Sequence, residues 1–150
     1  MKVCIVYAST HHGNTRKVVE AIAGEYEVEL IDATEVKERD LKDYDMIGFA
    51  SGIYAAQFHQ SVLNFASVNL PRSKKVFCIM TSAMGKDFSK GFLKTIENRE
   101  PEYLGSYYCT GYNTFGPFKL VGGTGKGHPD ETDLRKAVRF YEKLIRTDEE

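Results

Sequence analysis

The sequence predicts an α/β protein in which helices cover both faces of a five-stranded parallel sheet with strand order 2-1-3-4-5. Short apolar, β-prone runs alternate along the chain with segments of helical periodicity, which is the pattern of a doubly wound, three-layer α/β/α sandwich. The central runs 3–7, 46–50 and 76–80 are apolar throughout, as expected for parallel strands buried on both faces. A length of 150 residues suits a single domain spanning residues 1–150.

Periodicity and turn residues place the individual elements. Strands are predicted at residues 3–7, 27–31, 46–50, 76–80 and 103–109. Helices are predicted from Asn14 to about Gly24, around Phe58 to Ala66, around Phe88 to Ile96, and from about Asp130 to Arg146, with a short surface helix in the polar segment 34–44. The strand at 27–31 alternates in polarity and the strand at 103–109 contains a glycine, so both are expected at the sheet edges.

Composition excludes some classes of function. The net charge of −1 and the pI near 6.4 give no reason to expect a nucleic-acid partner, and no apolar run is long enough for membrane insertion. The three cysteines occur singly within apolar runs, which is typical of reduced thiols in a cytoplasmic protein. Acidic residues gather in 20–45 and basic residues in 72–99; either segment is a candidate docking surface, and the sequence does not choose between them.

Three loops are expected to converge on one site, because ligands of doubly wound folds bind beyond the carboxyl ends of the strands. They are residues 8–15, 51–58 and 81–87. The first places hydroxyls, a glycine and an asparagine at a helix start, where backbone N–H groups favour a phosphate; the same residue types also serve as ordinary helix caps. The candidate phosphate ligands are Ser9, Thr10, His11, His12, Gly13, Asn14 and Thr15.

The second and third loops are apolar and aromatic, and they suit a planar ring. Tyr54 is the expected stacking residue, with Met84 against the other face of the ring. The candidate ring contacts are Ser51, Gly52, Ile53, Tyr54, Ser82, Ala83, Met84 and Gly85. A phosphate end and an aromatic slot together describe a mononucleotide site, although such side chains also build ordinary hydrophobic cores.

Residues 7–15, Tyr-Ala-Ser-Thr-His-His-Gly-Asn-Thr, resemble the FMN-phosphate loop of flavodoxins, which usually reads Tyr-x-Ser-Thr-x-Gly-Asn-Thr. The order Ser51-Gly52-Ile53-Tyr54 resembles the second loop of that family, and Thr81–Gly85 stands in the place of the third. The resemblance implies a flavodoxin-like fold, FMN as cofactor, and low-potential electron transfer between redox protein partners.

The chain departs from the flavodoxin pattern at three points. The phosphate loop is one residue longer and contains two histidines, and Ile53 stands where many flavodoxins place a tryptophan. Tyr54 stands where several members have a glycine, and its Cβ resists a positive φ, which puts one-electron chemistry in doubt. A flavodoxin-like NAD(P)H- or quinone-dependent FMN oxidoreductase is therefore the second hypothesis, and a partner-binding domain that has lost the flavin is the third.

The other motifs in the sequence predict no further function. No Ser-His-Asp or Cys-His arrangement is assignable, and His11 and His12 lack the spacing of metal ligands, so neither catalytic residues nor a metal site are predicted. The glycine-rich residues 122–127 do not match a P-loop. The long loop 111–129 either covers the site, docks a partner, or is pinned to the sheet edge by Tyr112, Phe115 and Phe118; the last is favoured because long ordered loops need packing of their own.

Overall fold

A sheet with helices on both faces forms the framework of the computed structural model, which describes residues 1–10, 12–112, 123 and 125–149. The strands are β1 (Val3–Ala8), β2 (Glu29–Asp32), β3 (Met46–Tyr54), β4 (Gln57–Phe58), β5 (Lys75–Ser82) and β6 (Glu102–Thr110). The helices are α1 (Asn14–Ala23), α2 (Gln60–Asn69), α3 (Ser89–Ile96), the 3₁₀ turn η1 (Glu97–Arg99) and α4 (Glu131–Glu149).

The five long strands are parallel and lie in the order β2-β1-β3-β5-β6. Counted along the chain these are the first to fifth parallel strands, so the predicted 2-1-3-4-5 order and the flavodoxin-like fold class are confirmed. The two-residue strand β4 is an addition that the sequence does not predict, and it pairs antiparallel with the end of β3. Phe58, expected on a helix, therefore lies in β4, and α2 begins at Gln60.

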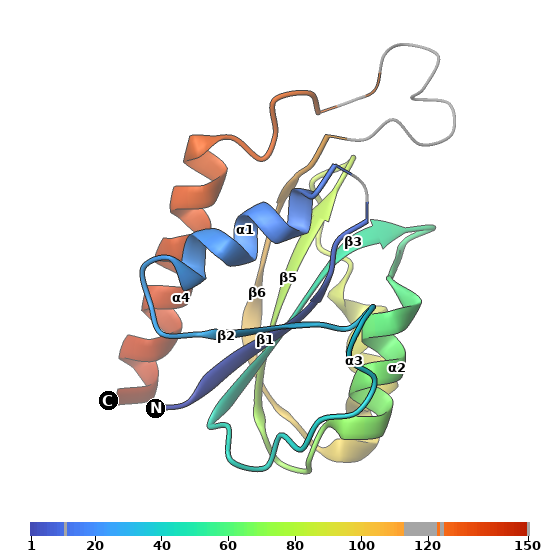
Figure 1. The fold of residues 1–150 in the computed structure, drawn as a ribbon, viewed down its shortest axis with the longest axis vertical. Coiled ribbons are helices and arrows are strands. Elements are labelled where there is room, and N and C mark those ends of the chain that lie inside the picture. Colours follow the sequence, from blue (N-terminus) through green and yellow to red (C-terminus); the bar gives the residue numbers. More distant parts are fainter. Residues whose placement is uncertain (11, 113–122, 124, 150) are drawn as a thin grey trace.

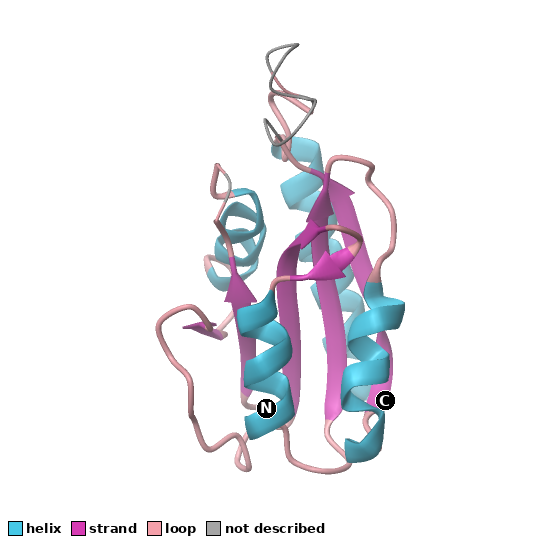
Figure 2. Ribbon diagram, turned by 90° about the vertical axis from the view of Figure 1, so that its right-hand side faces the viewer, coloured by secondary structure: helices cyan, strands magenta, loops and turns pink. Residues whose placement is uncertain are grey.

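Alternating side chains of the central strands pack into two separate hydrophobic cores, one on each face of the sheet. Cys4, Val6 and Ala8 of β1 point toward α2 and α3, whereas Val3, Ile5 and Tyr7 point toward α1 and α4. Both faces of the sheet are thus covered, α1 and α4 on one side and α2 and α3 on the other (Figures 1 and 2). This explains why the central strands are apolar throughout.

The predicted surface helix in residues 34–44 is wrong, because these residues contain turns and no helix. The carboxylate of Asp32 accepts hydrogen bonds from the backbone N–H and the hydroxyl of Thr34, at 2.9 and 2.7 Å, and such local bonding competes with helix formation. The buried side chains of Leu41 and Tyr44 then anchor the segment to the core.

The helices in the described part of the chain include none that is long and apolar enough to cross a bilayer.

Candidate functional site

The three predicted loops meet at one end of the sheet, where they line a narrow cleft. Parallel strands end on the same side, so the segments after β1, β3 and β5 lie together there (Figure 1). The cleft is lined by Ser9, Thr10, Asn14, Thr15, Gly52, Ile53, Tyr54, Thr81, Ser82, Ala83 and Gly111. Nine of these eleven residues are among the predicted contacts, and Thr81 and Gly111 are not.

Helix α1 begins at the cleft with backbone donors available. Its N-cap is Gly13, in the left-handed region at φ 66°, and no side chain of the N-cap bonds the first turn. Ser9 Oγ accepts a 3.1 Å hydrogen bond from the backbone N–H of Arg16. No hydrogen bond within the described residues occupies the backbone N–H groups of Asn14 and Thr15, so they are oriented donors at the positive end of the helix dipole.

Asn14 contributes a buried acceptor without a partner. Its residue is 8% exposed, and its Nδ2 donates a 2.7 Å hydrogen bond to the carbonyl of Tyr112. That bond fixes the orientation of the amide, and Oδ1 is then buried with no hydrogen-bond partner among the described residues. An unsatisfied buried acceptor is rare in folded proteins, so a donor supplied from the cleft is the expected complement.

Thr15 and Thr81 join α1 to the end of β5. Their hydroxyls lie 2.8 Å apart in a buried hydrogen bond. Gly111, just after β6, also lines this side of the cleft. It lies so near Asn14 that a Cβ at residue 111 would come within 2.6 Å of Asn14 Nδ2. Thr81 directly precedes the predicted ring contacts, and Gly111 follows the last strand at the same end of the sheet. Both could have been predicted as cleft residues from the rule that ligands bind beyond the carboxyl ends of the strands.

Tyr54 lies across the cleft. Its hydroxyl is 2.6 Å from the hydroxyl of Thr10, and a Cβ on Gly52 would come within 2.9 Å of the same Tyr54 oxygen. The Tyr54 ring meets the His59 ring edge-on, with centroids 5.5 Å apart. With Thr10 and Tyr54 in contact, the cleft encloses about 20 Å³, space for only one or two small polar groups.

Tyr54 is not among the residues with a positive φ, but the two residues that follow it are. Ala55 and Ala56 have φ values of 50° and 65°, and they form the two-residue turn between the paired residues Tyr54 and Gln57. Two positive φ values are the signature of a type I′ hairpin turn, which favours Asn-Gly. Alanine adopts this conformation at a cost of about 1–2 kcal/mol per residue.

The remaining described residues predicted to contact the cofactor do not line the cleft. Ser51 is buried and accepts a 2.8 Å hydrogen bond from the backbone N–H of His59. Met84 is 62% exposed and, like Gly85, does not line the cleft. The His12 ring packs against Tyr112 with centroids 4.3 Å apart. His11, Phe115 and Phe118 lie outside the described residues.

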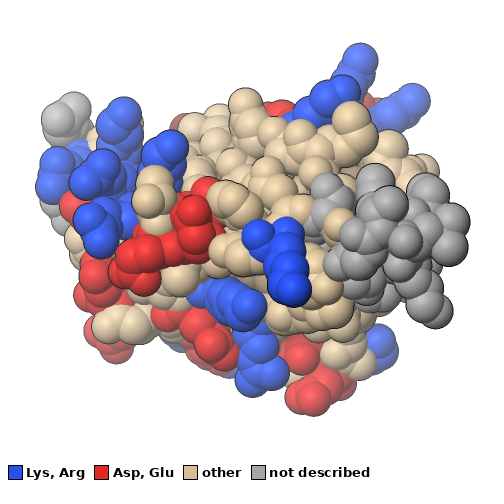
Figure 3. Space-filling model, turned by 90° about the horizontal axis from the view of Figure 1, so that it is seen from above, with Lys and Arg blue, Asp and Glu red and all other residues tan. Residues whose placement is uncertain are grey.

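The described cleft residues carry no charged side chain. Figure 3 looks onto this end of the molecule and shows an uncharged area beside the grey atoms, with a Lys or Arg side chain near the middle of the view and further charged groups of both signs around it. A bound anion would therefore be held by hydrogen bonds and the dipole of α1, with no cation from the lining residues.

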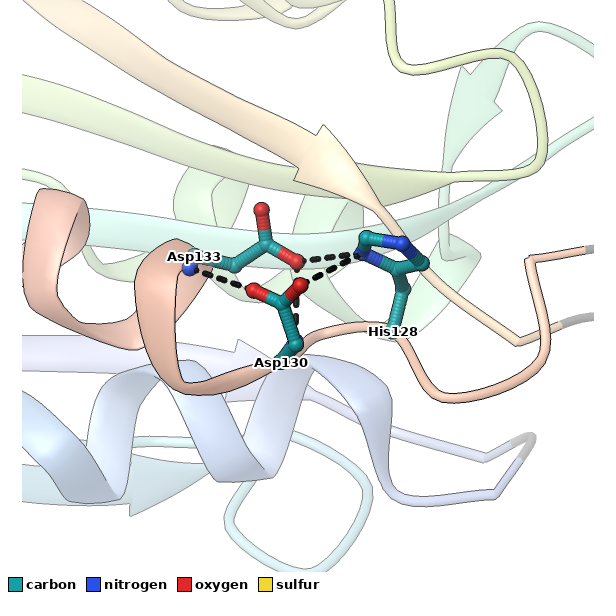
Figure 4. A group of neighbouring side chains, drawn as sticks. All are labelled: His128, Asp130 and Asp133. Atoms are coloured by element: carbon teal, nitrogen blue, oxygen red, sulfur yellow. Dashed lines mark hydrogen bonds and ion pairs between the residues drawn. The ribbon is translucent and has the colours of Figure 1, made fainter.

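A cluster of His128, Asp130 and Asp133 lies at the start of α4 (Figure 4). Asp133 Oδ2 is 2.6 Å from His128 Nδ1 and accepts the backbone N–H of Asp130 at 2.8 Å. In return, Asp130 Oδ1 accepts the backbone N–H of Asp133 at 2.9 Å. This reciprocal pattern is a capping box, and the hydrogen bond to Asp133 raises the pKa of His128 above its usual 6.5.

Comparison with known proteins identifies relatives of the whole chain. A family model described as "Flavodoxin domain" matches residues 4–105. The chain is 36% identical over 149 residues to "Uncharacterized protein MJ0298" of Methanocaldococcus jannaschii, covering 97% of this chain and 99% of that protein. A flavodoxin from the domain Archaea is 18% identical, covers 97% of this chain and 99% of its own, and superimposes with a TM-score of 0.67. The flavodoxin of Streptococcus pneumoniae TIGR4 is 16% identical, with coverage of 98% and 99% and a TM-score of 0.66.

Proposed function

Because the chain belongs to the flavodoxin family, we propose that it binds FMN and carries electrons between redox protein partners. FMN, when bound, supplies reversible electron transfer, and the protein supplies binding, orientation and electrostatics. The observation that carries the proposal is the convergence of the three loops on the N-terminus of α1.

The donor set at this cleft fits the phosphate and ribityl parts of FMN. The hydroxyls of Ser9, Thr10 and Thr15 and the backbone N–H groups of Asn14 and Thr15 provide donors for a phosphate dianion. The unpartnered Oδ1 of Asn14 needs a donor, which a phosphate dianion lacks and a ribityl hydroxyl has. His11, His12 and Gly13 complete the proposed phosphate loop.

The ring of FMN is proposed to lie between the second and third loops. Gly52, Ile53 and Tyr54 would line one side and Ser82 and Ala83 the other, with Ser51 supporting the second loop from within. Met84 and Gly85 follow in the third loop and do not line the cleft; we propose them as further contacts of the ring. Since the cleft encloses about 20 Å³ while Tyr54 contacts Thr10, we propose that Tyr54 leaves Thr10 when the ring binds.

Titration of the FMN-free protein with FMN, followed by quenching of flavin fluorescence, tests the proposal. Thr15→Val keeps the side-chain shape and removes one hydroxyl, so we expect the Kd to rise about tenfold or more, as for a hydrogen bond to a charged group. Ser67→Ala, on the exposed face of α2, serves as the control and should leave the Kd unchanged. Failure of the unmodified protein to bind FMN at micromolar concentrations would overturn the proposal.

An FMN-dependent oxidoreductase that uses NAD(P)H or a quinone is the second candidate. It is favoured by an uncharged groove that borders the cleft and shares Tyr54 with it. Reductive titration of the FMN-loaded protein separates the candidates: a carrier takes up electrons in two resolved one-electron steps. An enzyme instead bleaches in a single step and oxidises NAD(P)H or reduces a quinone with multiple turnovers.

A further inference from the structure

A groove lies beside the cleft, at the hairpin that links β3 to α2. It is lined by Thr10, Tyr54, Gln57, Phe58, His59 and Gln60. Its volume is about 420 Å³, within the range of roughly 300–1,000 Å³ that is usual for small-molecule sites. Thr10 and Tyr54 also line the cleft, so their hydrogen-bonded side chains form the partition between the two spaces.

The groove is built on rigid supports. Phe58 is 3% exposed and stacks on the buried Phe92, with centroids 4.9 Å apart and ring planes 18° apart. His59 is the N-cap of α2, and its backbone N–H donates to Ser51 Oγ at 2.8 Å. Phe58 and His59 are therefore held in place before any ligand binds, which lowers the entropic cost of binding.

Hydrogen bonding fixes the tautomer of His59. The backbone N–H of Ser61 is a donor, and it lies 3.0 Å from His59 Nδ1, which must accept. Neutral His59 therefore carries its proton on Nε2. Within the described part of the chain no hydrogen bond engages Nε2, and His59 is one of the residues that line the groove.

The lining also defines the chemical class of the ligand. Tyr54 and His59 provide aromatic surface, and Gln57 and Gln60 add amide groups. No lysine or arginine is among the described lining residues, and the His59 side chain already accepts the Ser61 N–H at the start of α2, whereas no N-cap side chain does so at α1. Phosphate groups, which favour cations and bidentate donors, are therefore less well matched to the groove than to the cleft. We propose that this groove binds an uncharged aromatic compound with carbonyl acceptors, such as a quinone, with His59 Nε2–H donating to a carbonyl oxygen.

This inference goes beyond FMN binding and does not require it, because Gln57, Phe58, His59 and Gln60 line the groove and do not line the cleft. With FMN bound in the cleft, a quinone in the groove would stand next to the cofactor as an electron acceptor. That placement favours the oxidoreductase candidate over the carrier.

The experiment is a titration of the protein with menadione, with and without FMN, followed by amide chemical shifts. We expect shifts at Gln57, His59 and Gln60 in both states. His59→Asn keeps an N-cap side chain that accepts the Ser61 N–H but removes the imidazole donor, so menadione binding should weaken about 3- to 10-fold, as for one neutral hydrogen bond. Val68→Ala, at an exposed position of α2, is the matched control and should bind menadione as the unmodified protein does.

Two further ligands test the proposed chemistry. 2-Methylnaphthalene has the same ring skeleton without carbonyl groups and should bind more weakly than menadione, with no difference between His59→Asn and the unmodified protein. NADH should cause no shifts at these three residues. Equal binding of 2-methylnaphthalene, tighter binding of NADH, or displacement of menadione by FMN would each overturn the proposal. FMN binding is measured separately in the same sample, so its failure would be distinguishable from failure of the groove.

Discussion

Gly48 in the middle of β3 shows how one residue without a side chain sets the packing of its neighbours. It is paired with Phe77 on β5, and a Cβ at residue 48 would lie 2.4 Å from Phe77 Cζ. Phe77 is completely buried, so the ring can yield to a Cβ at residue 48 only by shifting within the core.

Gly48→Ala should therefore destabilise the protein by about 1–3 kcal/mol, the usual range for overpacking a core. Urea denaturation monitored by circular dichroism measures the change in the free energy of unfolding. Gly91→Ala is the matched control, because that glycine lies on the exposed face of α3, where an added Cβ would meet nothing within 4 Å. We expect it to stabilise the protein by about 0.5–1 kcal/mol; a stabilising Gly48→Ala would contradict the packing argument.

His128 provides a second residue-scale prediction, this time of pH dependence. Its pKa is raised above 6.5 by the hydrogen bond to Asp133, and Asp130 adds a second negative charge. A pKa that is higher in the folded than in the unfolded state adds stability below pH 6.5, and this stability is lost as the pH rises through the folded-state pKa. Titration of the His128 ring by NMR should show the raised pKa, and Asp133→Asn should bring it back toward 6.5.

At the scale of elements, the β3–β4 hairpin departs most clearly from what a sequence pattern can predict. Its turn uses Ala55 and Ala56 at positive φ, where the usual Asn-Gly signal of a hairpin is missing. The strand β4 has only two residues, too few for alternation to be recognised. Apolar spacing consequently assigns Phe58 to the following helix, because a buried phenylalanine is consistent with either element.

Replacing Ala55-Ala56 by Asn-Gly should relieve the strain of this turn. The double variant is expected to be more stable by about 1 kcal/mol or more, because left-handed alanine costs about 1–2 kcal/mol per residue. The midpoint of urea denaturation measures this effect. The two replaced side chains are exposed and do not line the cleft, so a large loss of stability would show that the turn contributes packing that its geometry does not reveal.

At the scale of the whole molecule, strand order and the two cores are predictable, because apolar central strands leave few alternatives to a doubly wound sheet. The meeting of the three loops follows from topology alone. The contact between Thr10 and Tyr54, and the position of Gly111 against Asn14, depend on side-chain rotamers and on pairs far apart in sequence. No local pattern in the chain encodes them.

FMN binding should also stabilise the whole fold by mass action. At a free concentration about 100 times its Kd, a ligand that binds only the folded state adds about 2.7 kcal/mol. For a chain of this size each kcal/mol shifts the Tm by roughly 2–4 °C, so the Tm should rise by several degrees. Scanning calorimetry with and without FMN measures the shift, and riboflavin, which lacks the phosphate, should give a smaller one.

The hydrogen bond between Thr10 and Tyr54 has a consequence for the rate at which the protein takes up its cofactor. If FMN enters only after this contact opens, uptake contains a first-order step that does not depend on the concentration of FMN. The observed rate in stopped-flow mixing should then level off as FMN is increased. Tyr54→Phe, which keeps the ring and loses the hydroxyl, should raise that plateau, whereas a rate that stays linear in FMN would show that the cleft is open before the cofactor arrives.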